Sequence, residues 1–150
     1  MQLLRFKTLW GHSGTPQQAA ELAVAAQFDG LEAPLPADGG ARDVLAAALH
    51  GHGLRWIQEI CTAGSNVPHS KASDGEHLEG VGTRLHEGRA HGGEFANGMD
   101  GCDAWPLGDS VRFFAEAPGL AERVAHTASF EPHPRRICFA LLTPVAVPSP

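Results

Sequence analysis

Five short apolar runs alternate with longer helix-forming segments, and this alternation constrains the fold more than any other feature of the sequence. Each run ends near glycine, proline or small polar residues, as buried strands do where they enter loops. We expect strands at residues 3–10, 28–33, 54–60, 95–99 and 128–131. This alternation predicts parallel strands joined by right-handed crossovers.

The segments between the runs begin with residues that favour helix N-termini. Residues 15–18 (Thr-Pro-Gln-Gln) supply an N-cap, a proline at the first helical position and a Gln that can complete a capping box, and residues 19–27 continue as helix formers. Residues 38–52 are rich in Ala and Leu and precede Gly53, a residue suited to a helix end. Residues 73–76 (Ser-Asp-Gly-Glu) match a second capping box. Helices are therefore expected in these three segments.

Glycines and prolines predict weak points in the third and fourth helices. Gly80, Gly82 and Gly88 lie in the third helix, where each glycine costs about 1 kcal/mol relative to alanine. A fourth helix is expected from Pro106, which suits a helix start, to about residue 124, and Pro118 should break or kink it. We therefore expect the third helix to be the weakest element and the fourth to be interrupted.

The fold class that these patterns indicate is α/β, in one domain. Two architectures account for the alternation, a segment of a TIM-type (β/α) barrel and an open doubly wound sheet. No G-x-G-x-x-G motif follows the first strand, so the dinucleotide-binding form of the open sheet lacks its strongest signal. A chain of 150 residues, 43% of them hydrophobic, is long enough to bury one core.

Charge and apolar patterning argue against two classes of partner. The net charge is −6 and the eleven Lys and Arg residues are scattered, so we expect no nucleic acid partner. The longest apolar stretch, residues 137–147, is shorter than the roughly 20 residues that span a bilayer, so no membrane partner is expected. The N-terminus lacks a signal-peptide pattern, which predicts a cytoplasmic protein. Cys61, Cys102 and Cys138 form no C-x-x-C pair and are expected to be reduced thiols.

Polar residues stand at the end of every expected strand. They are His12, Glu32, Glu59, Asn97 and, at the last strand, Glu131 with His133. Because the carboxyl ends of parallel strands meet at one edge of a sheet, we expect these side chains to line one site. Glu131 is the strongest candidate, since residues two apart on an extended backbone point to the same side and His133 would lie beside it.

Most of these residues also have a simple structural explanation. His12 is one of nine histidines and can satisfy a turn. Glu32 and Glu59 can be solvated loop carboxylates, although an unpaired charge is costly beside apolar strand residues. Asp100 and Asp103, which flank a glycine, are typical of turns.

Five segments in order carry a resemblance to a known family. They are Leu-Trp-Gly-His at 9–12, Phe-Asp-Gly-Leu-Glu at 28–32, Glu-Ile-Cys-Thr-Ala-Gly at 59–64, Gly-Cys-Asp-Ala-Trp at 101–105 and Ser-Phe-Glu-Pro-His at 129–133. Together they resemble the xylose-isomerase-like sugar-phosphate isomerase/epimerase family. The resemblance spans residues 3 to about 136 and favours the barrel over the open sheet.

The resemblance implies a TIM-type barrel that binds a small sugar or polyol. It implies a divalent metal ion (Mn, Mg, Co or Zn) held by carboxylate and His side chains of the later strands, beginning with Glu131. The expected reaction abstracts a proton from the carbon next to a sugar carbonyl, with Glu131 as catalytic residue and metal ligand. The expected substrate-binding residues are His12, Glu32, Glu59, Asn97 and His133.

The chain also departs from the family pattern. A full barrel has eight strands and typically about 250 residues, whereas this chain has room for about five. We therefore expect a partial barrel at residues 1–136 and a divergent Pro-rich tail at 137–150, with an inactive chain as one outcome. Pro132 and Pro134 replace family-like residues around His133.

Three alternatives stay open. A non-catalytic partial barrel could act through self-association as a homo-oligomer, because an open arc leaves two sheet edges uncovered. An abasic-site endonuclease of the same superfamily is disfavoured by the acidic charge. A zinc module built from His69, His77, His86 and His91 lacks the i, i+4 His pair of helical metal sites.

Overall fold

The structure is a computed structural model that describes residues 2–63, 69 and 71–137. Five parallel strands form one sheet in the order β1-β2-β3-β4-β5, and a helix joins each strand to the next. The elements are β1 (Phe6–Thr8), α1 (Pro16–Ala25), β2 (Gly30–Pro34), α2 (Gly39–Gly51), β3 (Arg55–Cys61), α3 (Asp74–Ala90), β4 (Phe95–Met99), α4 (Leu107–Arg123) and β5 (Thr127–Phe130). The predicted α/β fold of about five parallel strands alternating with helices is confirmed.

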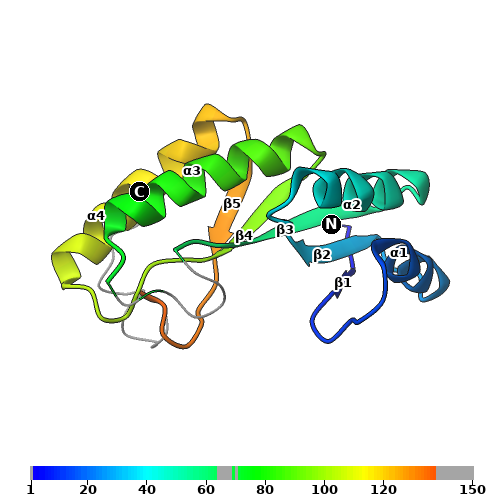
Figure 1. Cartoon of the computed structure of the whole chain (residues 1–150), viewed down its shortest axis with the longest axis horizontal. Helices are drawn as coiled ribbons and strands as arrows, with labels where there is room; N and C mark the ends of the chain where they lie inside the picture. The colour runs from blue at the N-terminus through cyan, green and yellow to red at the C-terminus, as the bar shows by residue number, and fades with distance from the viewer. Residues whose placement is uncertain (1, 64–68, 70, 138–150) are drawn as a thin grey trace.

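The helices pack on one face of the sheet. Side chains alternate between faces along a strand, and the register pairs Leu31 with Trp56 and Gln58 with Ala96, which places all four on the same face. In Figure 1, α3 and α4 lie side by side over the β4–β5 end of the sheet, while α1 and α2 lie at the β1–β3 end. The opposite face carries the intervening residues, among them Glu59 and Asn97.

Two apolar clusters fill the space between helices and sheet. The first joins α1 and α2 to β2 and β3, and its buried members are Ala19, Ala23, Leu31, Ala33, Leu35, Leu45, Leu49 and Trp56. The second joins α3 and α4 to β3–β5, and its buried members are Ile60, Val81, Leu85, Ala96, Phe113, Ala117, Ala121 and Ile137. Strand β3 contributes to both clusters, so it links the two halves of the core.

The helix starts form as the sequence predicts. The Thr15 side chain accepts a hydrogen bond from the Gln18 N–H while the Gln18 side chain bonds back to Thr15, and Ser73 and Glu76 repeat this exchange. Asp38 caps α2 through the Ala41 N–H. These bonds satisfy N–H groups that have no partner within the helix.

Pro118 does not break α4. Helical structure continues from Leu107 to Arg123 through Pro118. Phe113, Ala117 and Ala121 form a buried stripe at helical spacing on both sides of the proline. Burial of this stripe offsets the missing backbone hydrogen bond.

Other expectations about the ends of the chain are only partly covered by the described residues. Ile137, placed in the tail by the sequence, is buried in the second cluster, and residues 138–150, with Cys138, lie outside the described part. Cys61 and Cys102 are free cysteines. Within the described residues, no helix is both long and apolar enough to cross a membrane.

Candidate active site

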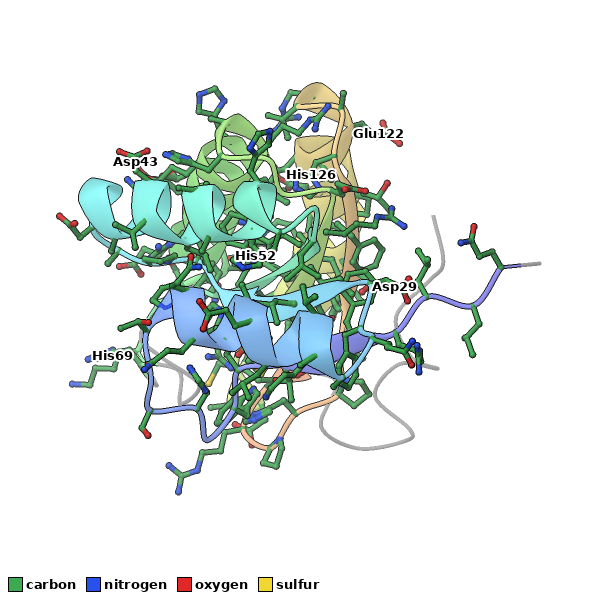
Figure 2. All side chains as sticks on the ribbon, turned by 90° about the vertical axis from the view of Figure 1, so that its right-hand side faces the viewer. Asp29, Asp43, His52, His69, Glu122 and His126 are labelled. Atoms are coloured by element: carbon green, nitrogen blue, oxygen red, sulfur yellow. The ribbon has the colours of Figure 1, made fainter. Side chains whose placement is uncertain are left out.

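The carboxyl ends of β2 to β5 bring a set of polar side chains to one edge of the sheet. The register places Glu59 beside Asn97 and Asn97 beside Ser129, in one row facing away from the helices. Glu131 follows β5 on the same side of the backbone as Ser129. Figure 2 shows Asp29, just before β2, and His69, in the segment that follows β3, on opposite sides of the molecule.

Asn97 is the centre of this set. Its Nδ2 donates to Glu131 Oε2 at 2.7 Å and to Glu32 Oε1 at 3.2 Å, and its Oδ1 accepts from the Ser129 hydroxyl at 3.2 Å. Glu32 lies 65 residues and Glu131 34 residues from Asn97 in the sequence, and the two glutamates come from different strand ends. One amide therefore joins β2, β4 and the residue that follows β5.

Glu59 is the most buried carboxylate of the set, with 6% of its surface exposed. Burial, and then the negative charges of Glu32 and Glu131, raise the pKa of the Glu59 carboxyl above its ordinary value, while a hydrogen bond with Trp10 and the nearby His133 act in the opposite direction. Its Oε2 has no hydrogen-bond partner among the described residues. Glu59 therefore has a buried oxygen without a described partner and a tendency to retain its proton.

The two predicted histidines occupy different places. His133 lies close enough to Glu59 to influence its charge, and its Nδ1 contacts the Pro134 carbonyl at 3.0 Å. His12 turns back on its own loop, where Nε2 lies 3.3 Å from the Thr15 carbonyl, and it lines a shallow pocket with α1 side chains. The structure brings Glu32, Glu59, Asn97 and Glu131 together and leaves His12 outside this set, on the loop before α1.

Two residues of this site were missed by the sequence reasoning. Ser129 donates a hydrogen bond to the Asn97 amide, and Trp10 lies close enough to Glu59 to lower the pKa of its carboxyl. Ser129 lies two residues before Glu131, so strand alternation is a signal that could have found it. Trp10 closes the first apolar run, where an exposed aromatic residue is a comparable signal.

A second polar cluster lies deeper, between β3, β4 and α3. The Thr62 hydroxyl bonds both the Asp100 carboxylate and His77 Nδ1, the latter at 2.7 Å, and the Gly101 N–H donates to His77 Nδ1 at 3.2 Å. Arg136 donates to the Thr62 and Gly101 carbonyls, each at 3.3 Å. Asp100, interpreted from sequence as a turn residue, is in fact a buried acceptor that ties the ends of β3 and β4 together.

Burial strongly shifts the pKa values of Asp100 and His77 in this cluster. It raises the pKa of Asp100 to about 6, against the opposing effect of the Thr62 hydrogen bond. Burial, aided by the positive charge of Arg136, lowers the pKa of His77 to about 4. The His77 ring lies edge-on to Trp105, with ring centroids 4.9 Å apart, which explains the loss of solvation. Between about pH 4 and 6, Asp100 is therefore protonated and His77 is a neutral imidazole.

The described residues do not complete a metal-binding set. No three His, Cys, Asp or Glu side chains in the described part of the chain are grouped so that they could hold a metal ion. Glu131, the predicted ligand, has one oxygen engaged by Asn97. The set offers acceptors for hydroxyl groups, and the raised pKa of the Glu59 carboxyl suits it to proton exchange.

The fold matches solved structures of sugar epimerases. Structures of D-allulose 3-epimerase from Methylomonas sp., one of them in complex with D-allulose, match with a TM-score of 0.68 at 16% identity, covering 97% of this chain and 58% of theirs. An L-ribulose 3-epimerase gives 0.69 at 17% identity, covering 96% and 56%. A 3-keto-D-glucoside 4-epimerase from E. coli gives 0.63 at 12% identity, covering 89% and 58%.

The resemblance to sugar isomerases and epimerases is thereby confirmed for the fold. The chain spans slightly more than half the length of these three epimerases. No protein-family model matches the sequence and no curated protein matches it. Identities this low show the fold alone, so the activity has to be argued from the site.

Proposed function

We propose that this chain is a sugar isomerase- or epimerase-like protein whose site moves a proton on the carbon next to the carbonyl of a small sugar or polyol derivative. The observation that carries the proposal is the joining of Glu131 and Glu32 through Asn97, with buried Glu59 nearby, at the edge where α/β barrels place their active sites. The fold shared with sugar epimerases supports the same class of substrate.

Glu131 is proposed as the base. Its carboxylate lies at the edge of the set, after β5, and accepts a hydrogen bond that fixes it without removing its second oxygen. Glu59 and Glu32, with His133 and His12 at the periphery, are proposed to bind substrate hydroxyl groups, for which carboxylates are good acceptors. The raised pKa of Glu59 also suits a group that donates a hydrogen bond to a substrate oxygen.

A divalent metal ion stays part of the proposal as an expectation from the resemblance. Glu131 would offer one ligand, and the described residues supply no complete set, so no step of the reaction is derived through the metal. Elemental analysis of the purified wild type and Glu131→Gln measures metal uptake directly. Equal metal content in both proteins would contradict Glu131 as a ligand.

Proton exchange in D₂O tests the activity without knowledge of the product. The protein is incubated with D-allulose and related ketoses, with and without Mn²⁺, Mg²⁺, Co²⁺ or Zn²⁺, and deuterium at the carbon beside the carbonyl is followed by NMR. We expect exchange with the wild type and at least about a 100-fold loss in Glu131→Gln, since a positioned base contributes about 10²–10⁴-fold.

The matched control is Glu122→Gln. Glu122 is an exposed glutamate near the end of α4, and Figure 2 places it on the same side as Asp29, across the molecule from His69. This variant should keep wild-type exchange. Wild-type protein that exchanges no ketose under any metal condition, or a Glu131→Gln variant as active as the control, would refute the proposed function.

A second candidate is a non-catalytic partial barrel that associates with another copy. The observation in its favour is that β1 and β5 are edge strands of the described sheet. Edge strands present unpaired backbone groups that favour pairing with another chain.

A further inference from the structure

The Asn97 amide has both of its N–H donors committed to carboxylates. An amide nitrogen carries two donors, and here one contacts Glu131 at 2.7 Å and the other Glu32 at 3.2 Å. A substrate contact, the role expected from sequence, would have to compete with two charge-assisted hydrogen bonds, which are stronger than neutral ones. The donor side of Asn97 is therefore occupied by the protein itself.

The orientation of the amide is set by its other end. Oδ1 accepts from the Ser129 hydroxyl at 3.2 Å. Rotation of the amide by half a turn would place Oδ1 against two carboxylate oxygens and Nδ2 against a hydroxyl, which removes two favourable bonds and creates two repulsive contacts. Because Asn97 and Ser129 are register partners on β4 and β5, the sheet itself holds this pair in place.

The position of Asn97 also offsets repulsion within the set. Glu32, Glu59 and Glu131 lie close enough for the charges of the other two to act on Glu59. Like charges at short range disfavour each other, and the carboxylates would move apart unless donors lay between them. The Asn97 Nδ2 is the described donor that bridges two of them.

We propose that Asn97 is a positioning residue that holds Glu131 and Glu32 in a fixed relation, with Ser129 fixing the amide. In this arrangement Glu131 Oε2 is held by Asn97, and Oε1 is the oxygen presented to the substrate. Asn97 then acts on the reaction through Glu131 and does not bind the substrate. The kinetic part of this inference rests on the proposed function, whereas the hydrogen-bond bridge is testable without any activity.

The bridge is tested first by NMR of the side-chain amides. The chain has two asparagines, Asn66 and Asn97, so protein labelled with ¹⁵N-asparagine gives two NH₂ groups, and the one lost in Asn97→Leu is that of Asn97. We expect its signals to shift in Glu131→Gln, in Glu32→Gln and in Ser129→Ala, and to stay unchanged in Glu122→Gln. Unchanged Asn97 signals in both glutamate variants would overturn the bridge, whether or not the protein is active.

Kinetics then separate positioning from substrate binding. A misplaced catalytic group costs up to about 100-fold in rate, so Asn97→Leu and the isosteric Asn97→Asp should lower kcat by about 10- to 100-fold with KM little changed. Ser129→Ala should show a smaller loss of kcat, and Ser129→Thr, which keeps the hydroxyl, should restore it. A rise in KM at constant kcat in Asn97→Asp would show a substrate contact and overturn the proposal.

Failure of the proposed function and failure of the hydrogen-bond bridge can be told apart. Wild-type protein without turnover would refute the proposed function, while shifted Asn97 signals in the glutamate variants would still establish the bridge. Asn97→Asp keeps the size and shape of the side chain but places a further carboxyl group between Glu32 and Glu131, whereas Asn97→Leu removes the donor without adding charge, so a loss of kcat in both variants reports the missing donor. Circular dichroism of each variant checks that the fold is retained.

Discussion

Burial of His77 and Asp100 makes folding transfer a proton between them. In the unfolded chain the ordinary pKa values of 6.5 and 3.8 leave the imidazole charged and the carboxylate ionised between about pH 4 and 6. In the folded chain the pKa of His77 falls to about 4 and that of Asp100 rises to about 6, so both groups are neutral in that window. The number of bound protons is the same in both states, and the pair adds no pH dependence to stability there.

Replacing either residue should make the free energy of unfolding depend on pH, with slopes of opposite sign in the two variants. In His77→Gln the raised pKa of Asp100 remains, and its stabilisation is present below about pH 4 and lost as pH rises through about 6. In Asp100→Asn the lowered pKa of His77 remains, and its stabilisation is present above pH 6.5 and lost as pH falls through about 4. Each change should amount to roughly 3 kcal/mol, since one pKa unit corresponds to about 1.4 kcal/mol.

Urea unfolding between pH 4 and 7 measures these slopes. The wild type is the internal control, because the two contributions cancel only when both residues are present. Free energies of unfolding that run parallel to the wild type in both variants would contradict the proton transfer. His77→Gln should therefore be least stable above about pH 6, and Asp100→Asn least stable below about pH 4.

At the scale of single residues, the sequence predicted the polar side chains at the sheet edge better than the buried cluster of Thr62, His77 and Asp100. Glu59, Asn97 and Glu131 follow from one rule, that polar residues at the carboxyl ends of parallel strands share an edge. Thr62 lies 15 residues from His77 and 38 residues from Asp100 in the chain. The three side chains meet only through the packing of α3 on the sheet. No local pattern encodes that packing, so Asp100 resembled an ordinary turn residue.

At the scale of elements, α3 shows a role of its glycines that local propensity does not contain. The sequence suggested that Gly80, Gly82 and Gly88 weaken this helix, and whether it is the weakest element stays a prediction. A Cβ on Gly88 would lie 1.7 Å from Gln58 Oε1, so this glycine allows α3 to approach β3 closely. Gln58 Nε2 uses the approach to bond the Arg84 carbonyl at 2.8 Å.

Two alanine substitutions in α3 should therefore have opposite signs. Gly88→Ala should destabilise the protein by about 1–3 kcal/mol, because overpacking against Gln58 outweighs the gain in helix propensity. Gly82→Ala should stabilise it by up to about 1 kcal/mol, since its Cβ would meet only Leu120 at 3.7 Å, an ordinary contact. Thermal and urea unfolding measure both, and stabilisation by Gly88→Ala would refute the close-packing role.

The remaining elements show where local signals were sufficient. The capping boxes at Thr15 and Ser73 place the first helical residues of α1 and α3 correctly, because a cap is a contact within four residues. The effect of Pro118 was misjudged because the burial of Phe113 and Ala117 is a tertiary property. Hydrogen bonds between residues close in the chain can be predicted from the sequence, whereas tertiary burial that outweighs local preferences cannot.

At the scale of the whole molecule, the five parallel strands and their helical connections followed from alternation alone. The choice between a barrel segment and an open sheet did not, because both have the same repeating unit, and the likeness to sugar epimerases decides it. The four described helices lie on one face of the sheet (Figure 1). Within the described part of the chain, the opposite face carries both the candidate site and apolar residues that no helix covers.

That open face predicts self-association of the 150-residue chain. Phe6, Ile57 and Phe95 project from it and are each partly exposed, and β1 and β5 are the edges of the described sheet. Apolar surface and unpaired edges both favour contact with a second copy. We expect light scattering to give a mass above the monomer value of 15.8 kDa that increases with concentration.

Variants on the two faces distinguish association through the open face from nonspecific association. Ile57→Thr should shift the distribution toward monomer, because it removes apolar area from the open face while keeping a β-branched strand residue. Val44→Thr makes the same chemical change on α2, where Val44 is 57% exposed on the helical side, and should leave the mass unchanged. A monomer at every concentration, or equal dissociation by both variants, would show that the open face of the sheet does not drive association.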